Sequence, residues 1–444
     1  MAKANLSTAD RLVHVLDHLG IERAHFAASM LADVIGLTQT YSERIASLTL
    51  LCPPRLDPSL GALGPRLLII AGDQGRPAAM VRNSVASLPE ATLVWLPGYF
   101  SPPWADVVVD RTEQVETAIL NSLSGEQAKN PRNVHDDVDV RGEIAGITYH
   151  GRGAGSPLVL LPLSLASSQW DPLLARLSAQ FCTVTLGGPE LGFLAMLESR
   201  GHSSGYLSVV KQIIDALQLK SEEVVLEVGC GSGVLDRWLA NYTTRRNPII
   251  GVDVNRYLLR EATALARKEG VEDVITFHGG DAEALPFREN QVDVAFSFTV
   301  FEEGNADRML AELVRVTKPG GRIAVMVRAL DIPWVINVPL PDDLKTKAQI
   351  PHGFVAAEGC AHGGLYRRFH QAGLTQVQMF PQFAASSRPD TAQAQFAHSA
   401  IVSTLNPQEM QEWHAAVAQA GADRTYFIAQ PFHCALGTKP ETAR

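Results

Sequence analysis

The stretch "VVLEVGCGSGVLDRWLANY", residues 224–242, decides how the C-terminal part of the chain folds. Its apolar start predicts a buried strand, and its end has the spacing of apolar residues that is typical of a helix. Gly229, Gly231 and Gly233 stand between the two. Glycine adopts positive φ and lets a ligand approach the backbone, and the N-terminus of the next helix offers free N–H groups. The stretch therefore predicts a strand, a turn and a helix that hold a ligand, although such a turn alone does not decide which one.

The residues around this turn supply its context. An acid, Glu227, stands two residues before the first glycine, and a second apolar strand ends at Asp253 in "IIGVDVN". A third strand leads to Asp281 in "HGGDAEALPF", and "VDVAFSF" (292–298) predicts a fourth. A helix, a Lys-Pro-Gly-Gly turn (318–321) and a fifth strand complete the pattern. Strands and helices that alternate in this way predict a parallel sheet whose carboxyl edge binds the ligand.

The order of these features resembles the class I S-adenosylmethionine (SAM) methyltransferases, and residues 426–440 resemble the terminal antiparallel strand of that family. The resemblance implies a Rossmann-like domain at 200–440, with a seven-stranded mixed sheet and helices on both faces. It implies SAM as the cofactor, with Asp253 on the ribose hydroxyls and with Asp281 and the Ala282 backbone at the adenine edge. A nicotinamide cofactor is the disfavoured alternative. The expected cofactor-binding residues are Tyr206, Glu227, Gly229, Gly231, Gly233, Asp253, Asp281, Ala282 and Phe298.

The resemblance also implies methyl transfer to a small-molecule acceptor by in-line displacement. In such a reaction the protein aligns the acceptor, excludes water and, for a protonated acceptor, removes a proton. The insertion at 329–369 is the expected acceptor side, with His352, His362 and Tyr366 as candidate catalytic residues. Glu303 stands where related enzymes often carry a histidine, so a role of that histidine has no counterpart here. His433, on the closing strand, is expected to pack in the core.

The N-terminal part of the chain shows a second α/β pattern in an unusual order. Residues 5–123 contain "IERAHFAASM", which resembles the strand and nucleophile elbow in the C-terminal half of an α/β-hydrolase. Residues 140–192 contain "LVLLPLSLASSQW", which resembles the N-terminal half of that fold. A polar linker at 124–139 joins the two halves. We expect a circularly permuted α/β-hydrolase-like domain at 1–195, in which Leu158 to Leu161 pair in parallel with Ala24 to Ala28.

The catalytic residues of a hydrolase are missing from this domain. The elbow normally reads G-x-S-x-G, but Ser29 stands between Ala27 and Leu31. The acid of the family would fall at Gly75 and its histidine at about Ser101. Without a base and an acid, Ser29 is not activated as a nucleophile. We expect a non-catalytic domain. The alternatives are a bifunctional enzyme in which Ser29 cleaves an ester, and a platform for dimerisation or docking.

Composition is consistent with an α/β enzyme that acts on small molecules. The 444 residues suffice for two or three domains, and 46% hydrophobic with 19% charged residues is ordinary for a globular protein. A net charge of −9 without a basic run argues against a nucleic-acid partner, and no apolar window predicts a membrane span. Five scattered cysteines without a C-x-x-C pair argue against disulfides and a metal site. The N-terminus lacks a secretory signal, so we expect a cytoplasmic protein, and the sequence allows a homodimer.

Overall fold

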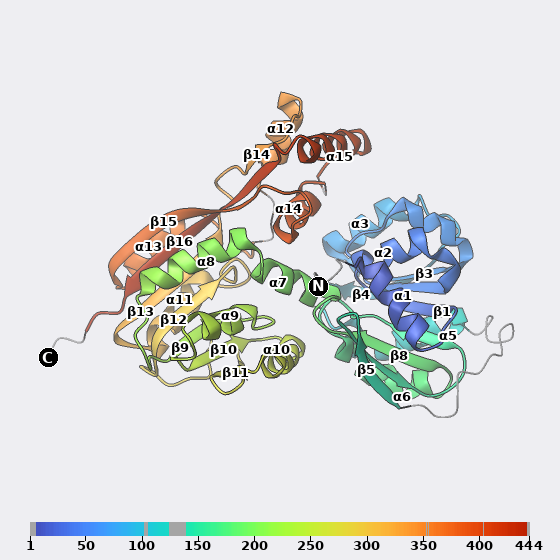
Figure 1. Cartoon of the computed structure of the whole chain (residues 1–444), viewed down its shortest axis with the longest axis horizontal. Coiled ribbons are helices and arrows are strands. Elements are labelled where there is room, and N and C mark those ends of the chain that lie inside the picture. Colours follow the sequence, from blue (N-terminus) through green and yellow to red (C-terminus); the bar gives the residue numbers. More distant parts are fainter. Residues whose placement is uncertain are drawn as a thin grey trace. The chain divides into compact units, whose positions relative to one another are not determined.

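The computed structural model describes residues 6–101, 105–123, 139–351, 353, 355–402 and 404–441. The chain divides into two compact units, unit 1 (Met1–Met196) and unit 2 (Leu197–Arg444). In Figure 1 unit 1 runs from blue to green and unit 2 from green to red. No helix among the described residues is long and apolar enough to cross a bilayer.

Unit 1 is built on an eight-stranded sheet with the order β4-β3-β2-β1-β7-β8-β6-β5. Neighbouring strands from β4 to β8 run parallel, and β6 runs antiparallel to both of its neighbours. Every residue of β1 and β2 is buried, which explains why these strands read as continuous apolar runs. Its elements are α1 Thr8–His18, β1 Ala24–Ala28, α2 Leu31–Thr40, β2 Ile45–Leu51, β3 Leu67–Gln74, α3 Gly75–Val85, β4 Thr92–Phe100, α4 Val107–Asp110, α5 Thr112–Leu123, β5 Val140–Ile144, β6 Ile147–Arg152, β7 Pro157–Leu160, α6 Asp171–Ser178, β8 Cys182–Gly187 and the start of α7 Gly192–Gly201.

The predicted pairing between distant segments of unit 1 is confirmed. β1 and β7 are parallel neighbours, with Phe26 opposite Val159 and Ala27 opposite Leu160. The N–H of Leu161 donates to the carbonyl of Ala27 at 2.9 Å, which continues the ladder past the end of β7. The two segments thus form the centre of one sheet. Most of the predicted linker at 124–139 lies outside the described residues.

Unit 2 is built on a second mixed sheet, ordered β11-β10-β9-β12-β13-β16-β14, with β15 also paired to β16. The strands from β11 to β13 are parallel, and the predicted antiparallel closing strand is confirmed as β16. Its elements are α8 Ser204–Leu217, β9 Val225–Val228, α9 Val234–Tyr242, β10 Ile249–Asp253, α10 Arg256–Lys268, β11 Ile275–Gly279, β12 Val292–Phe298, α11 Ala306–Val316, β13 Thr317–Arg328, β14 Val335–Asn337, α12 Asp342–Gln349, α13 Gly364–Gln371, β15 Thr375–Ser386, α14 Ala392–Val402, α15 Pro407–Ala422 and β16 Phe427–Thr438.

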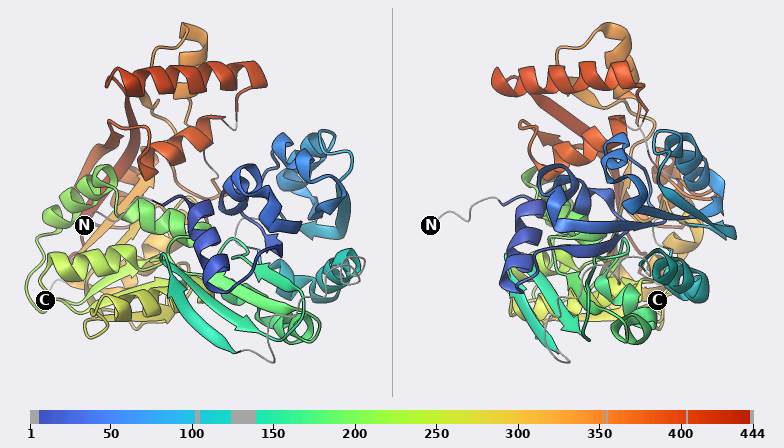
Figure 2. Two further views of the ribbon diagram at one scale, coloured as in Figure 1. Left: turned by 45° about the vertical axis from the view of Figure 1, so that its right-hand side comes forward. Right: turned by 90° about the vertical axis from the view of Figure 1, so that its right-hand side faces the viewer.

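The sheet of unit 2 has eight strands where seven were expected. The additional strand is β14, three residues of the insertion that pair with the first residues of β16. This end of β16 projects beyond β13 and carries α12, α14 and α15, seen in orange and red in both views of Figure 2. These elements enclose a small apolar core of their own around Trp334 and Trp413. The insertion therefore enlarges the sheet instead of forming only a loop.

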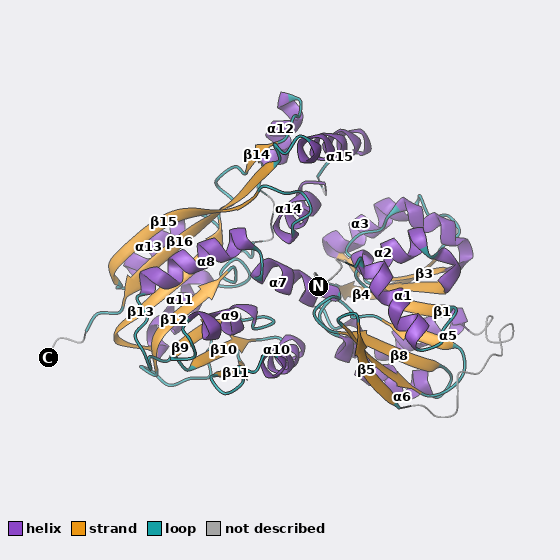
Figure 3. Ribbon diagram, in the orientation of Figure 1, coloured by secondary structure: helices purple, strands orange, loops and turns teal. Residues whose placement is uncertain are grey.

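Helices cover both faces of the unit 2 sheet (Figure 3). Apolar residues of α8 and α9 pack with one face of β12 and β13, and those of α11 and α13 pack with the other. The alternation along β13 shows this division: Ala324 and Met326 belong to the first core, and Ile323 and Val325 to the second. The two cores lie on the two faces of the sheet. The polar residues described below lie at the ends of its strands, called here the amino edge and the carboxyl edge.

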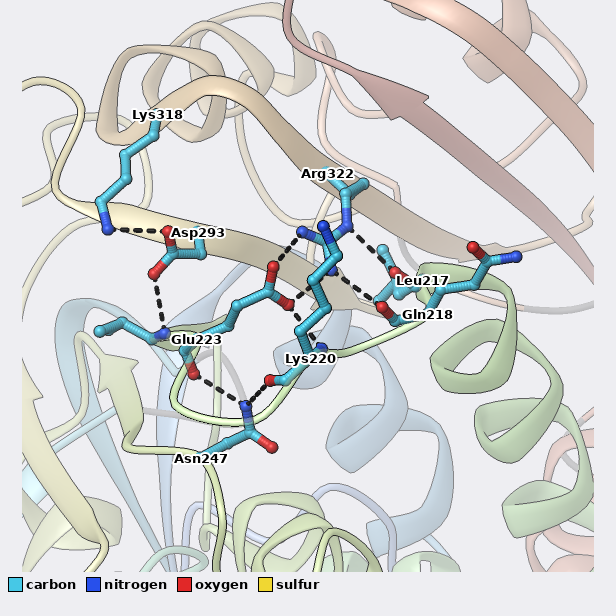
Figure 4. Close-up of polar contacts among 9 residues, drawn as sticks. Leu217, Gln218, Lys220, Glu223, Asn247, Asp293, Lys318 and Arg322 are labelled. Carbon is cyan, nitrogen blue, oxygen red and sulfur yellow. Dashed lines mark hydrogen bonds and ion pairs between the residues drawn. The ribbon is translucent and has the colours of Figure 1, made fainter.

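The amino edge of this sheet is closed by ion pairs and hydrogen bonds (Figure 4). Both terminal nitrogens of Arg322 lie 2.7 Å from the Glu223 carboxylate, and Lys318 Nζ lies 2.7 Å from Asp293 Oδ1. The side-chain amide of Asn247 donates to the carbonyls of Lys220 and Glu223. The hydrogen bonds from Arg322 hold the pKa of Glu223 below its usual value. This network fastens the segment between α8 and β9 to the sheet.

Candidate functional site

The glycine turn lies between β9 and α9 at the carboxyl edge of the unit 2 sheet. Gly229, Gly231 and Gly233 all have positive φ, at 79°, 55° and 68°. The N–H groups of Gly229 and Cys230 both donate to the carbonyl of Val252, at 2.7 and 2.9 Å, which fixes the turn against β10. A Cβ on Gly229 would lie 2.1 Å from a methyl group of Val300. Glycine is required here by both conformation and space.

Asp253, the last residue of β10, joins the turn to the neighbouring strand. Its Oδ2 accepts a hydrogen bond from the N–H of Gly231 and its Oδ1 one from the N–H of Asn255, both at 2.8 Å. The carbonyl of Asp253 accepts from the N–H of Gly280 at 3.1 Å, which brings the exit of β11 alongside. Asp281 follows directly and is exposed, as its position at the rim requires. Burial raises the pKa of Asp253.

Two further acids lie beneath the turn, and three of their carboxylate oxygens have no donor among the described residues. Glu227 is 3% exposed and Asp236, in the first turn of α9, is 0% exposed. Glu227 Oε2 and both carboxylate oxygens of Asp236 are buried without a hydrogen-bond partner. Burial raises the pKa of both groups, and the Asp236 carboxyl raises that of Glu227 further. Perturbed acids in a cleft of this kind mark a candidate binding site.

Arg237 stabilises the turn from below. Its Nη1 donates to the carbonyl of Ser232 at 2.7 Å, and its Nε lies 2.8 Å from Glu269 Oε1. Its Nη2 pairs with Glu198, and the Arg237 side chain is 1% exposed. The guanidinium therefore satisfies a carbonyl of the glycine turn while it is itself neutralised by two carboxylates.

The exit of β12 forms the adjoining side of the site. Thr299 has a φ of 60°, unusual for a β-branched residue, and such strain is found mostly where a local geometry is functional. Its hydroxyl accepts from Arg200 Nη1 at 3.4 Å, and the Arg200 guanidinium lies 5.1 Å from the centroid of the Tyr206 ring. Tyr206 and Phe298 are 1% and 4% exposed. Because the Phe298 side chain packs against Phe296, its expected role in cofactor binding rests on its backbone.

Several residues at this edge were not anticipated from the sequence. Glu302 is fully buried and its Oε1 accepts from the N–H of Arg328 at 2.8 Å, which links the exits of β12 and β13. His433 is buried as expected, but its Nε2 lies 2.8 Å from Asp331 Oδ1 and its Nδ1 has no partner among the described residues. The sequence indicates His433 only as a core residue, and its pairing with Asp331, which lies 102 positions earlier in the chain, was not anticipated.

The described contacts do not bring the three candidate catalytic residues together. His352 lies outside the described residues. His362 is exposed, and its Nδ1 accepts from the N–H of Gly364 at 2.9 Å, at the start of α13. Tyr366 is 40% exposed and its ring packs edge-on against His370. By contrast, Glu227, the three glycines, Asp253 and the Asp281–Ala282 pair all lie where β9, β10 and β11 end.

Comparison with known proteins agrees with this geometry. A family model described as a methyltransferase domain matches residues 226–325. A demethylmenaquinone methyltransferase from Thermobifida fusca is 31% identical over 181 residues, 37% of this chain and 74% of the relative. Methyltransferase GfsG from Streptomyces halstedii is 32% identical over 118 residues, 26% of this chain and 42% of the relative. The chain spans about half the length of several curated relatives that it matches.

Among solved structures, a geranyl diphosphate C-methyltransferase from Streptomyces coelicolor A3(2) was crystallised with S-adenosyl-L-homocysteine. The match has 12% identity and a TM-score of 0.33, and it covers 52% of this chain and 79% of that chain. The family model includes the glycine turn and the strands that follow it, and the Thermobifida relative is matched over 74% of its length. The chain therefore belongs to the SAM-dependent methyltransferases.

Proposed function

We propose that unit 2 transfers the methyl group of SAM to a small-molecule acceptor by in-line displacement, with the cofactor held at the carboxyl edge of its sheet. The observation that carries this proposal is the set of polar groups gathered there: the glycine turn, Asp253 and the buried, unpartnered Glu227. One relative is named for demethylmenaquinone, and a small organic acceptor is the class that we propose for this chain. The catalytic roles of His352, His362 and Tyr366 stay predictions.

The residues at this edge fit SAM. Positive φ at the three glycines gives the tight turn that brings backbone N–H groups to the carboxyl edge, and the absence of side chains at these positions suits close approach of a ligand. The Asp253 carboxylate would accept hydrogen bonds from the ribose hydroxyls through its remaining lone pairs, while the N–H groups of Gly231 and Asn255 orient it. The Glu227 carboxyl would face positive charge on the methionine part, and Asp281 with Ala282 would lie at the adenine.

Methyl transfer from SAM requires few catalytic side chains. SAM supplies an activated methyl group together with its leaving group. The chain must align the acceptor with that methyl group and keep water away. Arg200, Tyr206 and Thr299 contact one another at the exit of β12, next to the turn, and they are the residues that we place at the reacting end.

The test of the cofactor site is Asp253→Ala. Two hydrogen bonds donated by the ribose hydroxyls to a charged carboxylate are each worth about 1.5–3 kcal/mol, so SAM affinity should fall by about 100-fold or more in titration calorimetry. Asp293→Ala is the matched control, because it removes a carboxylate from the amino edge of the same sheet, where it pairs with Lys318. Unchanged SAM affinity in Asp253→Ala would show that the cofactor is placed wrongly.

We propose further that unit 1 is a permuted α/β-hydrolase-like domain without hydrolytic activity. Support comes from the strand order. The strands β1 to β4 form one half of the sheet and β5 to β8 the other, and β1, the first strand in sequence, lies at the centre beside β7. The Ser29 hydroxyl lies 3.1 Å from the hydroxyl of Ser164, and φ of Ser29 is not positive. The side chain of His25, on the same strand, bonds instead to Ser47 at 2.8 Å.

A nitrophenyl ester tests the hydrolytic alternative. The full-length protein should release no more nitrophenolate than Ser29→Ala does, because within the described residues the Ser29 hydroxyl bonds to the Ser164 hydroxyl and to no base. Turnover that disappears in Ser29→Ala would establish a bifunctional enzyme and overturn the proposal for unit 1.

A further inference from the structure

Glu227 and Asp236 form a buried pair of carboxyl groups directly below the glycine turn. Glu227 lies near the end of β9, where Gly251 of β10 is its neighbour in register, and Asp236 lies in the first turn of α9 against the same Gly251. A Cβ on Gly251 would lie 2.6 Å from Asp236 Oδ2, so β10 closes the third side of the pair. Neither residue exposes more than 3% of its surface. The pair therefore lies in a low-dielectric pocket shaped by β9, β10 and α9.

The charged groups that face this pair do not neutralise it. Arg237 is adjacent to Asp236 in sequence, but its nitrogens bond to Glu198, Glu269 and a turn carbonyl. The positive charge of Arg200 lowers the pKa of Glu227 only slightly, whereas burial and the negative charges of Asp236 and Asp253 raise it. The Cys230 thiol also faces the pair, and burial keeps its pKa well above the ordinary value. Glu227 thus has no close cation among the described residues.

A shared proton is the arrangement that satisfies both groups. A carboxylate only accepts hydrogen bonds, so two ionised carboxylates cannot bond to each other, whereas a carboxylic acid donates to its neighbour. Glu227 Oε2 and both oxygens of Asp236 have no other donor among the described residues. Two neighbouring carboxyl groups in a buried site repel each other when both are ionised, and this favours one shared proton, as in other paired carboxyl groups of proteins.

We propose that Glu227 and Asp236 share one proton when the site is free, and that binding of SAM expels this proton because the cation replaces it beside Glu227. Asp236 is then a positioning residue, which keeps Glu227 protonated until a cation arrives. The proton leaves to solvent, the Glu227 carboxylate remains to face the positive methionine part, and no covalent bond changes. The inference rests on the proposed placement of SAM and adds a proton linkage to it.

This linkage predicts both a proton count and a pH dependence. Up to one proton should be released for each SAM bound near pH 7. As the pH rises, the dissociation constant of SAM should fall by up to about tenfold per pH unit while the free pair is still protonated. The affinity should become independent of pH once the free pair has lost its proton.

Titration calorimetry of the full-length protein with SAM, in phosphate and in Tris at the same pH, measures the count. The two buffers differ in ionisation enthalpy, so the difference in observed heat gives the protons released. In Asp236→Asn the amide donates permanently to Glu227, so SAM should still bind but release close to zero protons. Asp293→Asn, at the amino edge, should release as many protons as the unmodified protein.

The outcomes separate the inference from the proposed function. Absence of any SAM binding would overturn both. Binding without proton release, or equal release in Asp236→Asn and the unmodified protein, would overturn the shared proton alone. If Asp236→Asn does not fold, the pH dependence of SAM affinity in the unmodified protein decides, because a constant affinity between pH 6 and 9 excludes the linkage.

Discussion

At the amino edge of the unit 2 sheet Glu223 and Asp293 each have a cationic partner at 2.7 Å, whereas at the carboxyl edge Glu227 and Asp236 have none among the described residues. The pKa values differ accordingly. Arg322 lowers the pKa of Glu223 at the amino edge, and burial raises the pKa values of Glu227 and Asp236 at the carboxyl edge. Both sets belong to one sheet and one folding unit. An unpaired buried acid destabilises the fold, so its retention at one edge only is best explained by a ligand that pairs with it.

The carboxyl edge also contains a buried ion pair, Arg237 with Glu198, and removal of its cation is expected to give the largest effect. In Arg237→Met the carboxylate of Glu198 would remain buried without its partner, and the turn would lose the donor to Ser232. Breaking a buried ion pair on one side costs about 3–5 kcal/mol. Hydrogen exchange of the α9 amides should report a local loss of that size.

Arg245→Met is the control for that experiment. Arg245 lies 3.8 Å from Asp273 and both side chains are largely exposed, so the loss should stay below about 1 kcal/mol. Equal losses in the two variants would mean that burial does not govern the strength of these pairs, and the contrast between the edges would lose its physical basis.

Gly229→Ala separates space from conformation at the turn. Positive φ costs about 1–2 kcal/mol for alanine, and the contact with Val300 adds about 1–3 kcal/mol of overpacking. Gly270→Ala is the matched control, since Gly270 has a φ of 66° and nothing lies within 4 Å of the position that a Cβ would take there. Urea denaturation should show the larger loss for Gly229→Ala, and only this variant should weaken SAM binding. Similar effects in both would remove the argument that the turn is shaped by close packing.

The elements around the turn could be predicted because local pattern and tertiary structure agree there. The strands β9 and β10 are mostly apolar and largely buried; Gly229 follows the first directly, and Asp253 is the last residue of the second. Gly151, Gly153 and Gly155 lie at the end of β6 and in the turn before β7, but this turn does not join paired strands. β6 pairs with β5 through a turn at Ala145–Gly146, and β7 pairs elsewhere in the sheet. Glycine content shows where a chain can turn, but not which strands the turn joins.

The buried polar groups could not be predicted from local pattern. An acid in the first turn of a helix is ordinarily an exposed group that favours the helix dipole, which is how Asp236 reads in sequence. Its burial depends on the approach of Gly251 from another strand. The role of Arg237 depends likewise on Glu198 and Glu269, which come from distant segments. Contacts of this kind arise only when the sheet and its helices are assembled.

Arg322→Met tests the amino edge, where the smallest effect is expected. Loss of the bidentate pair with Glu223 should cost about 1–3 kcal/mol at pH 7 in urea denaturation. Arg322 lowers the folded-state pKa of Glu223, so the stability from this pair is present above the unfolded-state pKa of about 4.3 and is lost as pH falls through the lower folded-state value. The difference in unfolding free energy between the two proteins should therefore shrink below about pH 4. A difference that stays constant from pH 7 down to pH 3 would show that Glu223 gains nothing from its charge, and that the amino edge is held by packing and not by its ion pairs.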